Sequence, residues 1–344
     1  MVDCYHKEFT MKPVRLSEIA ARYQLDLRGE NLEIRMMGLL SHRSRYRSQQ
    51  LTFAVTPDYI QSFSAGDVGA CVVDVRNLKF VPSHRSVLVG DGDPEENFYN
   101  IFADSVAGNF WPKLETSMGQ DNSIASSTAI HDHVQIGDNC VIMDNVVILP
   151  NTHIGNNVVI KPNSVIGGDG WEARIIHKRR RVPPHAGGVW IENYVQIGSN
   201  CCIDRGLFGD FTYIGQETLL DNLIYVAHSC TLGERCKITA CVEISGNVVL
   251  GHNVWLGPNT SVINHVSIGD HSFLGIGSNV LTNVPRHALA YGNPAKVRGW
   301  VCLCRQKLEF EAGRTTCVRC ETEYALDGGN VSRAEEETSP VIKL

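Results

Sequence analysis

The middle of the chain carries an Ile, Leu or Val residue at every sixth position. This pattern runs through positions 124–166, 191–203 and 214–280, and many of the aliphatic residues are followed by Gly and a small polar residue. A period of six fits neither a helix, with 3.6 residues per turn, nor an alternating strand. It predicts short strands joined by tight corners, with three hexads forming each coil of a triangular solenoid. We therefore expect a mainly β protein built on a left-handed parallel β-helix, with the aliphatic side chains inside.

The six-residue register is broken at two places. Ile166 and Ile191 are separated by an insert, residues 167–190, that is too long for one hexad and must leave the solenoid as a loop. Between Ile203 and Ile214 the spacing is 11 residues, where 12 would keep the phase. Long loops in a regular scaffold tend to carry function. The insert is therefore expected to carry function, and the shorter break is a local irregularity that could re-aim side chains.

The remaining sequence lacks the hexad pattern. Residues 17–23 predict a helix capped by Ser17, residues 68–75 predict a buried strand, and residues 94–102 predict a second helix. These features indicate a small α/β domain. The resulting division of the chain is an α/β domain at 1–117, the β-helix at 118–299, a zinc-ribbon-like segment with four cysteines at 300–326 and a flexible tail at 327–344.

Composition excludes several classes of protein. The 31 Lys and Arg residues are balanced by 37 Asp and Glu residues, so a nucleic-acid-binding surface is not expected. The sequence has no apolar run long enough to predict a membrane-spanning helix. Twelve cysteines without a recognisable export signal predict a reducing, cytoplasmic location.

Several motifs carry a resemblance to a known family. They are LTFAVTPDY at 51–59, IGGDGW at 166–171, GGVWI at 187–191, IDRG at 203–206 and DNLIYVAH at 221–228. With these motifs the chain resembles the UDP-3-O-acylglucosamine N-acyltransferases of lipid A synthesis, over about residues 15 to 285. The resemblance implies that residues 1–117 form a nucleotide-binding domain. It also implies N-acyl transfer from a thioester to the amine of a nucleotide-linked amino sugar, by a homotrimer with active sites between subunits.

Two histidines are the main catalytic candidates. Acyl transfer to an amine needs a base, and imidazole is suited to this role near neutral pH. His228 and His265 follow the inward positions Val226 and Val262, which lie two coils apart on one face, about 10 Å from each other. We predict His228 as the general base and Asp221 as a carboxylate that orients it. The resemblance makes His265 a candidate oxyanion or phosphate contact.

Further candidates concern the substrates. In the resembled family an aromatic pair, here Phe53 and Tyr59, stacks on a uracil ring; packing in the domain core is the alternative. The matched motifs add Asn222, Asp169 and Trp171 as substrate contacts. The expected donor is acyl-CoA or an acyl-carrier protein. Arg179 and Arg180, in a basic run of the insert, are candidates to bind its phosphates, and a solvated loop is the alternative. Asn293 and Lys296 are further candidates, because their motif is similar to the closing motif of acetyl-CoA-dependent sugar acetyltransferases.

The C-terminal cysteines form a separate constellation. Cys302, Cys304, Cys317 and Cys320 make two close pairs that can supply four thiolates to a tetrahedral Zn²⁺. We predict a structural zinc site, with disulfides or free thiols as the alternatives. A site with four thiolates is closed and has no catalytic role.

Two functions other than acyl transfer are possible for this sequence. The first is a non-catalytic scaffold or nucleotide-sugar-binding protein in which His228 is incidental. The second is a γ-type carbonic anhydrase, which needs three histidines around Zn²⁺. The position five residues after His228 is Gly233, so the second closely spaced ligand of that class is missing.

Overall fold

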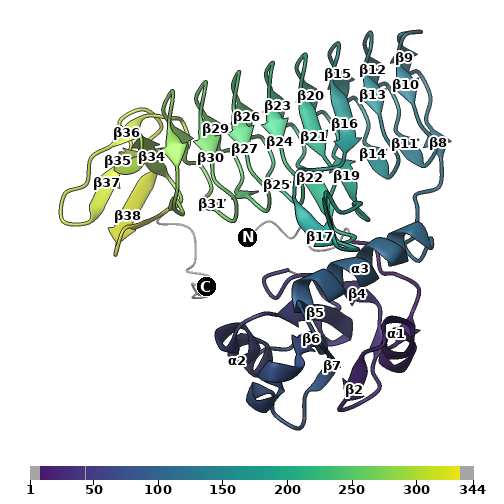
Figure 1. Cartoon of the computed structure of the whole chain (residues 1–344). Coiled ribbons are helices and arrows are strands. Elements are labelled where there is room, and N and C mark those ends of the chain that lie inside the picture. The colour runs from purple at the N-terminus through teal and green to yellow at the C-terminus, as the bar shows by residue number, and fades with distance from the viewer. Residues whose placement is uncertain (1–7, 43, 334–344) are drawn as a thin grey trace.

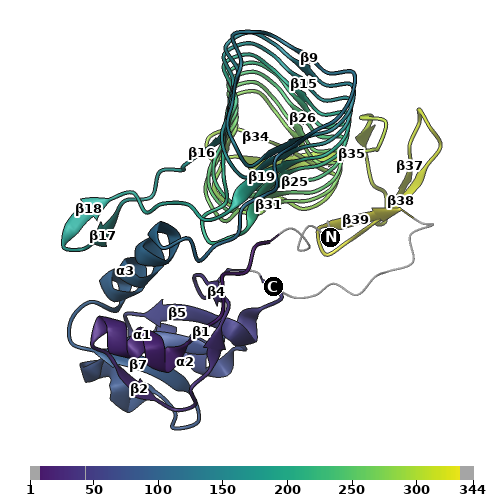
Figure 2. The ribbon, with the colours of Figure 1, turned by 90° about the vertical axis from the view of Figure 1, so that its right-hand side faces the viewer.

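The main body of the molecule is a long β-helix with a smaller domain attached to one side. The structure is a computed structural model that describes residues 8–42 and 44–333. Figure 1 shows the stack of coils from the side, and Figure 2 shows that each coil is triangular when viewed along the stack. The predicted left-handed parallel β-helix is confirmed. No helix of the described residues is long and apolar enough to cross a membrane.

The β-helix has three faces, each a sheet of parallel strands, which we name after strands in its middle. The β24 face contains β10 (Ala129–Ile130), β13 (Val147–Ile148), β16 (Val165–Gly168), β21 (Cys202–Asp204), β24 (Tyr225–Val226), β27 (Glu243–Ile244), β30 (Ser261–Val262) and β33 (Asn279–Val280). The β25 face contains β8 (Ser117–Met118), β11 (Val134–Ile136), β14 (Thr152–Ile154), β19 (Gly188–Ile191), β22 (Phe211–Ile214), β25 (Thr231–Leu232), β28 (Val249–Leu250) and β31 (Ser267–Ile268). The β26 face contains β9 (Ser123–Ile124), β12 (Val141–Ile142), β15 (Val159–Ile160), β20 (Gln196–Ile197), β23 (Leu219–Leu220), β26 (Lys237–Ile238), β29 (Trp255–Leu256) and β32 (Phe273–Leu274).

The six-residue period is the period of this winding. Residues 18 positions apart pair directly across neighbouring coils, as Ile142 does with Ile160 and Ile244 with Val262. The hexad aliphatics point inward and form one continuous buried cluster along the solenoid. Many corners contain an Asn in the left-handed conformation, for example Asn139 with φ of 57°. This conformation explains the small polar residues of the repeat, because Asn adopts positive φ more readily than most residues.

The N-terminal domain contains a five-stranded sheet between helices. Its strand order is β2 (Asp26–Arg28), β7 (Ser86–Gly90), β6 (Ala70–Asp74), β5 (Gln50–Ala54) and β4 (Met36–Met37), and β1 (Val14–Arg15) pairs with β3 (Glu33–Ile34). Helices α1 (Leu16–Tyr23) and α3 (Pro94–Ala107) pack on one side of the sheet, and α2 (Pro57–Ala65) packs on the other. Short 3₁₀ turns occupy η1 (Arg47–Gln49) and η2 (Val75–Phe80). The predicted Ser17 cap is wrong, because α1 begins one residue earlier and Arg15 occupies the N-cap position.

The C-terminal end of the β-helix continues into a small cysteine-containing unit. Strands β34 (Ala288–Tyr291), β35 (Lys296–Val301) and β36 (Lys307–Leu308) extend the β26 face, and the last two run antiparallel. A three-stranded antiparallel sheet follows, formed by β37 (Arg314–Thr316), β38 (Glu323–Asp327) and β39 (Asn330–Arg333). Regular structure therefore extends past the expected boundary at residue 326, and residues 334–344 of the expected tail lie outside the described residues.

A hydrophobic cluster joins the N-terminal domain to the β-helix. Phe208, in the turn between β21 and β22, packs against Phe98 and Phe102 of α3, with ring centroids 5.8 Å and 5.0 Å away. The insert contributes β17 (Arg174–Ile176) and β18 (Arg179–Arg181), a hairpin that lies beside α3 (Figure 2). Both irregular segments of the repeat thus contact α3.

The alternation of inward and outward residues generates a stability prediction. In β20, Ile197 is fully buried and its neighbour Gln196 is exposed. We expect Ile197→Ala to lower the free energy of unfolding by about 2–5 kcal/mol, because it leaves a cavity in the solenoid core. Gln196→Ala should change it by less than about 0.5 kcal/mol. Calorimetric melting of the two variants checks this prediction. Equal effects on stability would contradict the assignment of Ile197 to the interior of the β-helix and of Gln196 to its outer surface.

Candidate active site

Both breaks of the six-residue register fall at the same corner of the prism. We name the stacked turns from the β24 face to the β25 face the His228 corner; they include residues 169–187, 205–210, 227–230, 245–248 and 263–266. The insert and the 11-residue spacing are two successive turns of this corner. Other turns of the corner hold three to four residues, so these two extend outward toward the N-terminal domain.

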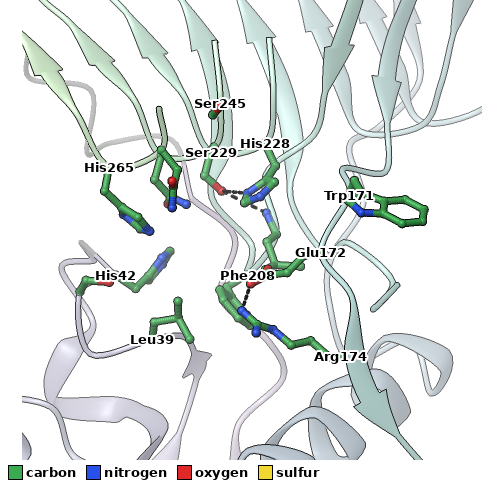
Figure 3. Close-up of a pocket in the computed structure, with 15 residues that line it drawn as sticks. Leu39, His42, Trp171, Glu172, Arg174, Phe208, His228, Ser229, Ser245 and His265 are labelled. Carbon is green, nitrogen blue, oxygen red and sulfur yellow. Dashed lines mark hydrogen bonds and ion pairs between the residues drawn. The ribbon is translucent and has the colours of Figure 1, made fainter. Parts of the chain in front are cut away.

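A cavity of about 340 Å³ lies where the His228 corner, the insert and the N-terminal domain meet. Figure 3 shows labelled side chains from these three parts of the chain around the cavity, with the ring of Trp171 directed away from the others. Its lining comprises Leu39, Ser41, His42, Trp171, Glu172, Arg174, Leu207, Phe208, His228, Ser229, Ser245, Gly246, Asn247, Asn264 and His265. The sequence-predicted pair His228 and His265 therefore shares one cavity.

Two glycines make room for the His228 ring. A Cβ at Gly246, on the next coil, would lie 2.7 Å from His228 Nε2, and a Cβ at Gly170, in the insert, would lie 2.8 Å from its Cδ2. Any side chain at either position would therefore displace the imidazole. On its other side, His228 Nδ1 is 3.4 Å from the hydroxyl oxygen of Ser229.

The surroundings keep the His228 imidazole neutral near pH 7. Burial lowers its pKa, because the charged form loses hydration, and the nearby His265 acts in the same direction. The carboxylates of Glu172 and Asp210 oppose this effect. His185 of the insert packs edge-on to His228, with ring centroids 5.7 Å apart, and burial lowers its pKa as well. A neutral imidazole is the form that can accept a proton.

His265 reaches the cavity from a left-handed corner position. Its φ is 62°, and its N–H donates to the carbonyl of Gly246 at 3.1 Å. Ser229 and Asn247 have the same conformation 36 and 18 residues earlier. His265 is therefore the third of three stacked left-handed corner residues that face the cavity.

Sequence reasoning missed the contribution of the N-terminal domain. His42 lines the cavity, and Figure 3 shows its ring and that of His265 pointing toward each other. Glu172 and Arg174 of the insert form an ion pair at the wall next to Phe208. No hexad or motif marks His42, because its position depends on how the domain packs on the β-helix.

The predicted pairing of Asp221 with His228 is not formed within the chain. Asp221 follows β23 on the β26 face, whereas His228 follows β24, so the two residues occupy different corners of the prism. Asp221 and His228 are seven residues apart in the sequence. This is about the length of one hexad, so the chain has passed from one corner of the triangular coil to the next. The carboxylates that act on His228 are Glu172 and Asp210 instead. Asn222 stands beside Asp221, where its side-chain oxygen accepts the Ser199 N–H at 2.8 Å.

The remaining residues of the insert motif lie at the edge of the site. Asp169 forms an ion pair with Arg205, at 3.3 Å, and Arg205 also donates to the carbonyl of Gly167. Trp171 lines the cavity but is 80% exposed, and Figure 3 shows its ring directed away from the other labelled residues. Trp171 is thus open to a ligand or a second chain, while Asp169 is already engaged.

The predicted aromatic pair is divided between two sides of the N-terminal sheet. Phe53 packs against Phe98 and Tyr99 of α3, with ring centroids 5.1 Å and 6.0 Å away. Tyr59 lies in the first turn of α2, on the other side of the sheet, and is 54% exposed. Phe53 therefore contributes to the core, and Tyr59 has a free ring face.

The predicted donor-binding residues lie away from the cavity. The hairpin that holds Arg179 and Arg180 contacts α3, where the backbone N–H of Lys178 donates to Glu96. Arg180 lines a separate cavity of about 310 Å³ at the start of α3. Asn293 accepts a hydrogen bond from Asn279 at the last coil, and Lys296 is exposed in β35.

The four C-terminal cysteines lie together. Their sulfur atoms are all within 4.8 Å of one another, with Cys302 3.3 Å from Cys320 and Cys304 3.5 Å from Cys317. Zn–S bonds of about 2.3 Å in a tetrahedron place sulfurs about 3.8 Å apart, so the cluster fits this ion. Among the described residues, no other set of three or more His, Cys, Asp or Glu side chains, the cavity histidines included, comes together closely enough to hold a metal ion.

Comparisons with known proteins agree with this architecture. Residues 133–168 match the family model of the bacterial transferase hexapeptide, six repeats. A UDP-N-acetylglucosamine acyltransferase structure from Bacteroides fragilis superposes on 54% of this chain and 71% of its own, with a TM-score of 0.50 and 26% identity. The fold and repeat thus define a transferase of the hexapeptide-repeat class.

Sequence relatives identify the family more closely. The UDP-3-O-acylglucosamine N-acyltransferase 1 of Sulfurimonas denitrificans is 32% identical over 303 residues, which cover 81% of this chain and 92% of that protein. The UDP-3-O-acylglucosamine N-acyltransferases of Caulobacter sp. and Methylobacterium nodulans are 37% and 40% identical over 119 and 118 residues, about a third of their lengths. The chain belongs to the UDP-3-O-acylglucosamine N-acyltransferase family.

The electrostatics of the cavity can be tested by titration. Because burial lowers the pKa of His228, its imidazole should titrate below the ordinary value of about 6.5 in an NMR titration of histidine side chains. Glu172→Gln should lower the pKa further, because it removes a carboxylate that stabilises the charged form. Glu243→Gln, on the outer side of the β24 face, is the control and should leave it unchanged. A pKa above 6.5, or one unaffected by Glu172→Gln, would contradict this description.

Proposed function

We propose that the protein is an N-acyltransferase that moves an acyl group from a thioester to the amine of a nucleotide-linked amino sugar. The observation that carries this proposal is the position of His228, held neutral in a cavity walled by the β-helix, the insert and the N-terminal domain. Membership of the UDP-3-O-acylglucosamine N-acyltransferase family supports the choice of reaction.

The proposed reaction requires a base at the position of His228. The lone pair of the amine attacks the thioester carbonyl carbon, and His228 takes a proton from the attacking nitrogen. The tetrahedral intermediate then collapses, the C–S bond breaks, and the proton returns to the leaving thiolate, so that an amide and a free thiol result. Ser229 and Asn247 supply polar groups near the developing charge.

The donor is a thioester of coenzyme A or of an acyl-carrier protein, since either provides the same reacting group. A donor approaching along the outside of the His228 corner would run past the successive coils toward Asn293 and Lys296. These two residues follow the β33 coil, three coils beyond β24 in the strand order of that face. The stacked turns thus offer an extended surface for a pantetheine arm.

We also propose a homotrimer. Flat prism faces suit packing around a threefold axis, and the corner between the β26 face and the β24 face carries the exposed apolar residues Leu223 (56%) and Ile276 (73%). Exposed apolar side chains on a regular solenoid favour a protein partner. A neighbouring copy would also give Asp221 and Trp171, which are exposed here, a route to the site.

Replacement of His228 distinguishes the enzyme from a scaffold. His228→Ala should lower turnover of a UDP-linked amino sugar about 10²–10⁴-fold, the usual contribution of a general base, while binding of the nucleotide sugar persists. Mass spectrometry of the amide product, with acetyl-CoA and longer acyl donors, provides the readout. His131→Ala, at an exposed turn several coils away, is the matched control. An unchanged rate in His228→Ala, or no amide from any donor and acceptor pair, would refute the proposal.

We further propose that the four C-terminal cysteines bind zinc as a structural ion. Cys302 and Cys317 lie in a small core with Leu308, Tyr324 and Val331, which is too small to hold three strands together alone. Zinc would supply the missing cross-link, and four thiolates require a reducing compartment.

Metal analysis tests the zinc proposal. Protein purified with zinc in the medium should contain one zinc per chain, and the Cys304→Ser/Cys317→Ser variant should contain none. Cys241→Ser, which replaces an exposed thiol of the β-helix, should retain the metal. The double variant should also unfold its C-terminal segment at a lower temperature. Equal zinc content in the two variants would disprove the assignment.

A further inference from the structure

His42 carries a polar atom that the described part of the chain leaves without a partner. Its Nε2 is buried and makes no hydrogen bond there, although the residue lines the cavity that contains His228. Buried polar atoms in folded proteins almost always have a partner, and leaving one unpaired is unfavourable. A ligand in the cavity is the natural partner for this nitrogen.

Side-chain hydrogen bonds hold the loop that carries His42. The Gln50 side chain donates to the carbonyls of Gly38 and Leu39, at 3.1 Å and 2.9 Å, and Arg47 donates to the carbonyl of His42 at 2.6 Å. The His42 ring lies against Gly38, where a Cβ would be 2.9 Å from its Cγ. The orientation of the imidazole is therefore set before any ligand binds.

The second side of the ring is fixed by the interface between domain and β-helix. Phe208 meets the His42 ring edge-on, with centroids 5.9 Å apart. The same Phe208 packs against α3, so the contact that attaches the domain also positions His42. Across the cavity, His265 is held by its left-handed corner conformation, and the two rings point toward each other (Figure 3).

We propose that His42 and His265 together bind a phosphate oxygen of the nucleotide-linked acceptor. This inference rests on the proposed function, which places the reacting amine at His228. In such an acceptor the diphosphate lies between the sugar and the nucleoside. His42 belongs to the nucleotide-binding-like domain and His265 to the β-helix, so this pair lies where the linking phosphates must pass. Each imidazole can donate an N–H to an anionic oxygen, and such charge-assisted hydrogen bonds are strong.

Binding of UDP, compared with that of uridine, isolates the phosphate contact. His42→Phe keeps an aromatic ring beside Phe208 but removes both nitrogens, so the loop should stay folded. We expect it to weaken UDP binding about tenfold to hundredfold in calorimetry, the loss typical of a hydrogen bond to a charged group, and to leave uridine binding unchanged. His42→Gln retains an N–H donor and should lose less. His84→Ala, at an exposed turn of the same domain, is the control.

Steady-state kinetics with acceptors that contain or lack phosphate provide a second test. His42→Phe should raise KM for the UDP-linked amino sugar, with little change in kcat, and should leave the rate with a phosphate-free amino sugar unaltered. Combining it with His265→Ala should cost less than the two single changes predict, because both residues contact one group. A residue that merely supports the fold would affect both acceptors equally.

The outcomes separate this inference from the proposed function. Equal UDP affinity in His42→Phe and the unchanged protein, or no UDP binding by the unchanged protein, overturns the phosphate contact. If UDP binding weakens as expected but no amide forms with any donor, the phosphate contact stands and the acyl-transfer proposal fails. Loss of uridine binding together with UDP binding also contradicts the inference, because it locates His42 at the base rather than at the phosphates.

Discussion

The candidate site depends on the packing of Phe208 into the N-terminal domain. The turn between β21 and β22 is longer than the other regular turns of its corner, and this extra length lets Phe208 reach α3 and the ring of His42. Burial of an aromatic side chain here provides apolar contact area and edge-on ring contacts. Without this contact the domain would lose part of its apolar attachment to the β-helix, and the His42 ring would lose the aromatic neighbour that positions it at the cavity.

The β-helix itself contributes regularity, and the site arises where that regularity is interrupted. Because each coil contains 18 residues, Ser229, Asn247 and His265 lie one above the other on successive coils. They form a row of polar side chains beside His228. The insert covers one end of this row with Gly170, Glu172 and His185. This cover partly buries His228 and lowers its pKa, so the enclosure and the availability of a neutral base have the same physical origin.

Much of this architecture could be predicted from the sequence because the hexad period encodes the winding. The 36-residue spacing of the inward residues Val226 and Val262 predicted that the histidines after them share one cleft, and the length of the insert predicted that it leaves the prism as a loop. Contacts between units could not be predicted in this way. His42 and Glu172 join the cavity only through domain packing, Phe53 turned inward to α3, and Asp221 was assigned to His228 although one hexad moves the chain to another corner.

A crystal structure of the protein with a UDP-linked amino sugar would test the central claim most directly. The account predicts the sugar amine within hydrogen-bonding distance, about 3 Å, of His228, with a phosphate oxygen between His42 and His265. It would be contradicted by a sugar bound outside the cavity of the His228 corner, or by an amine that faces away from His228.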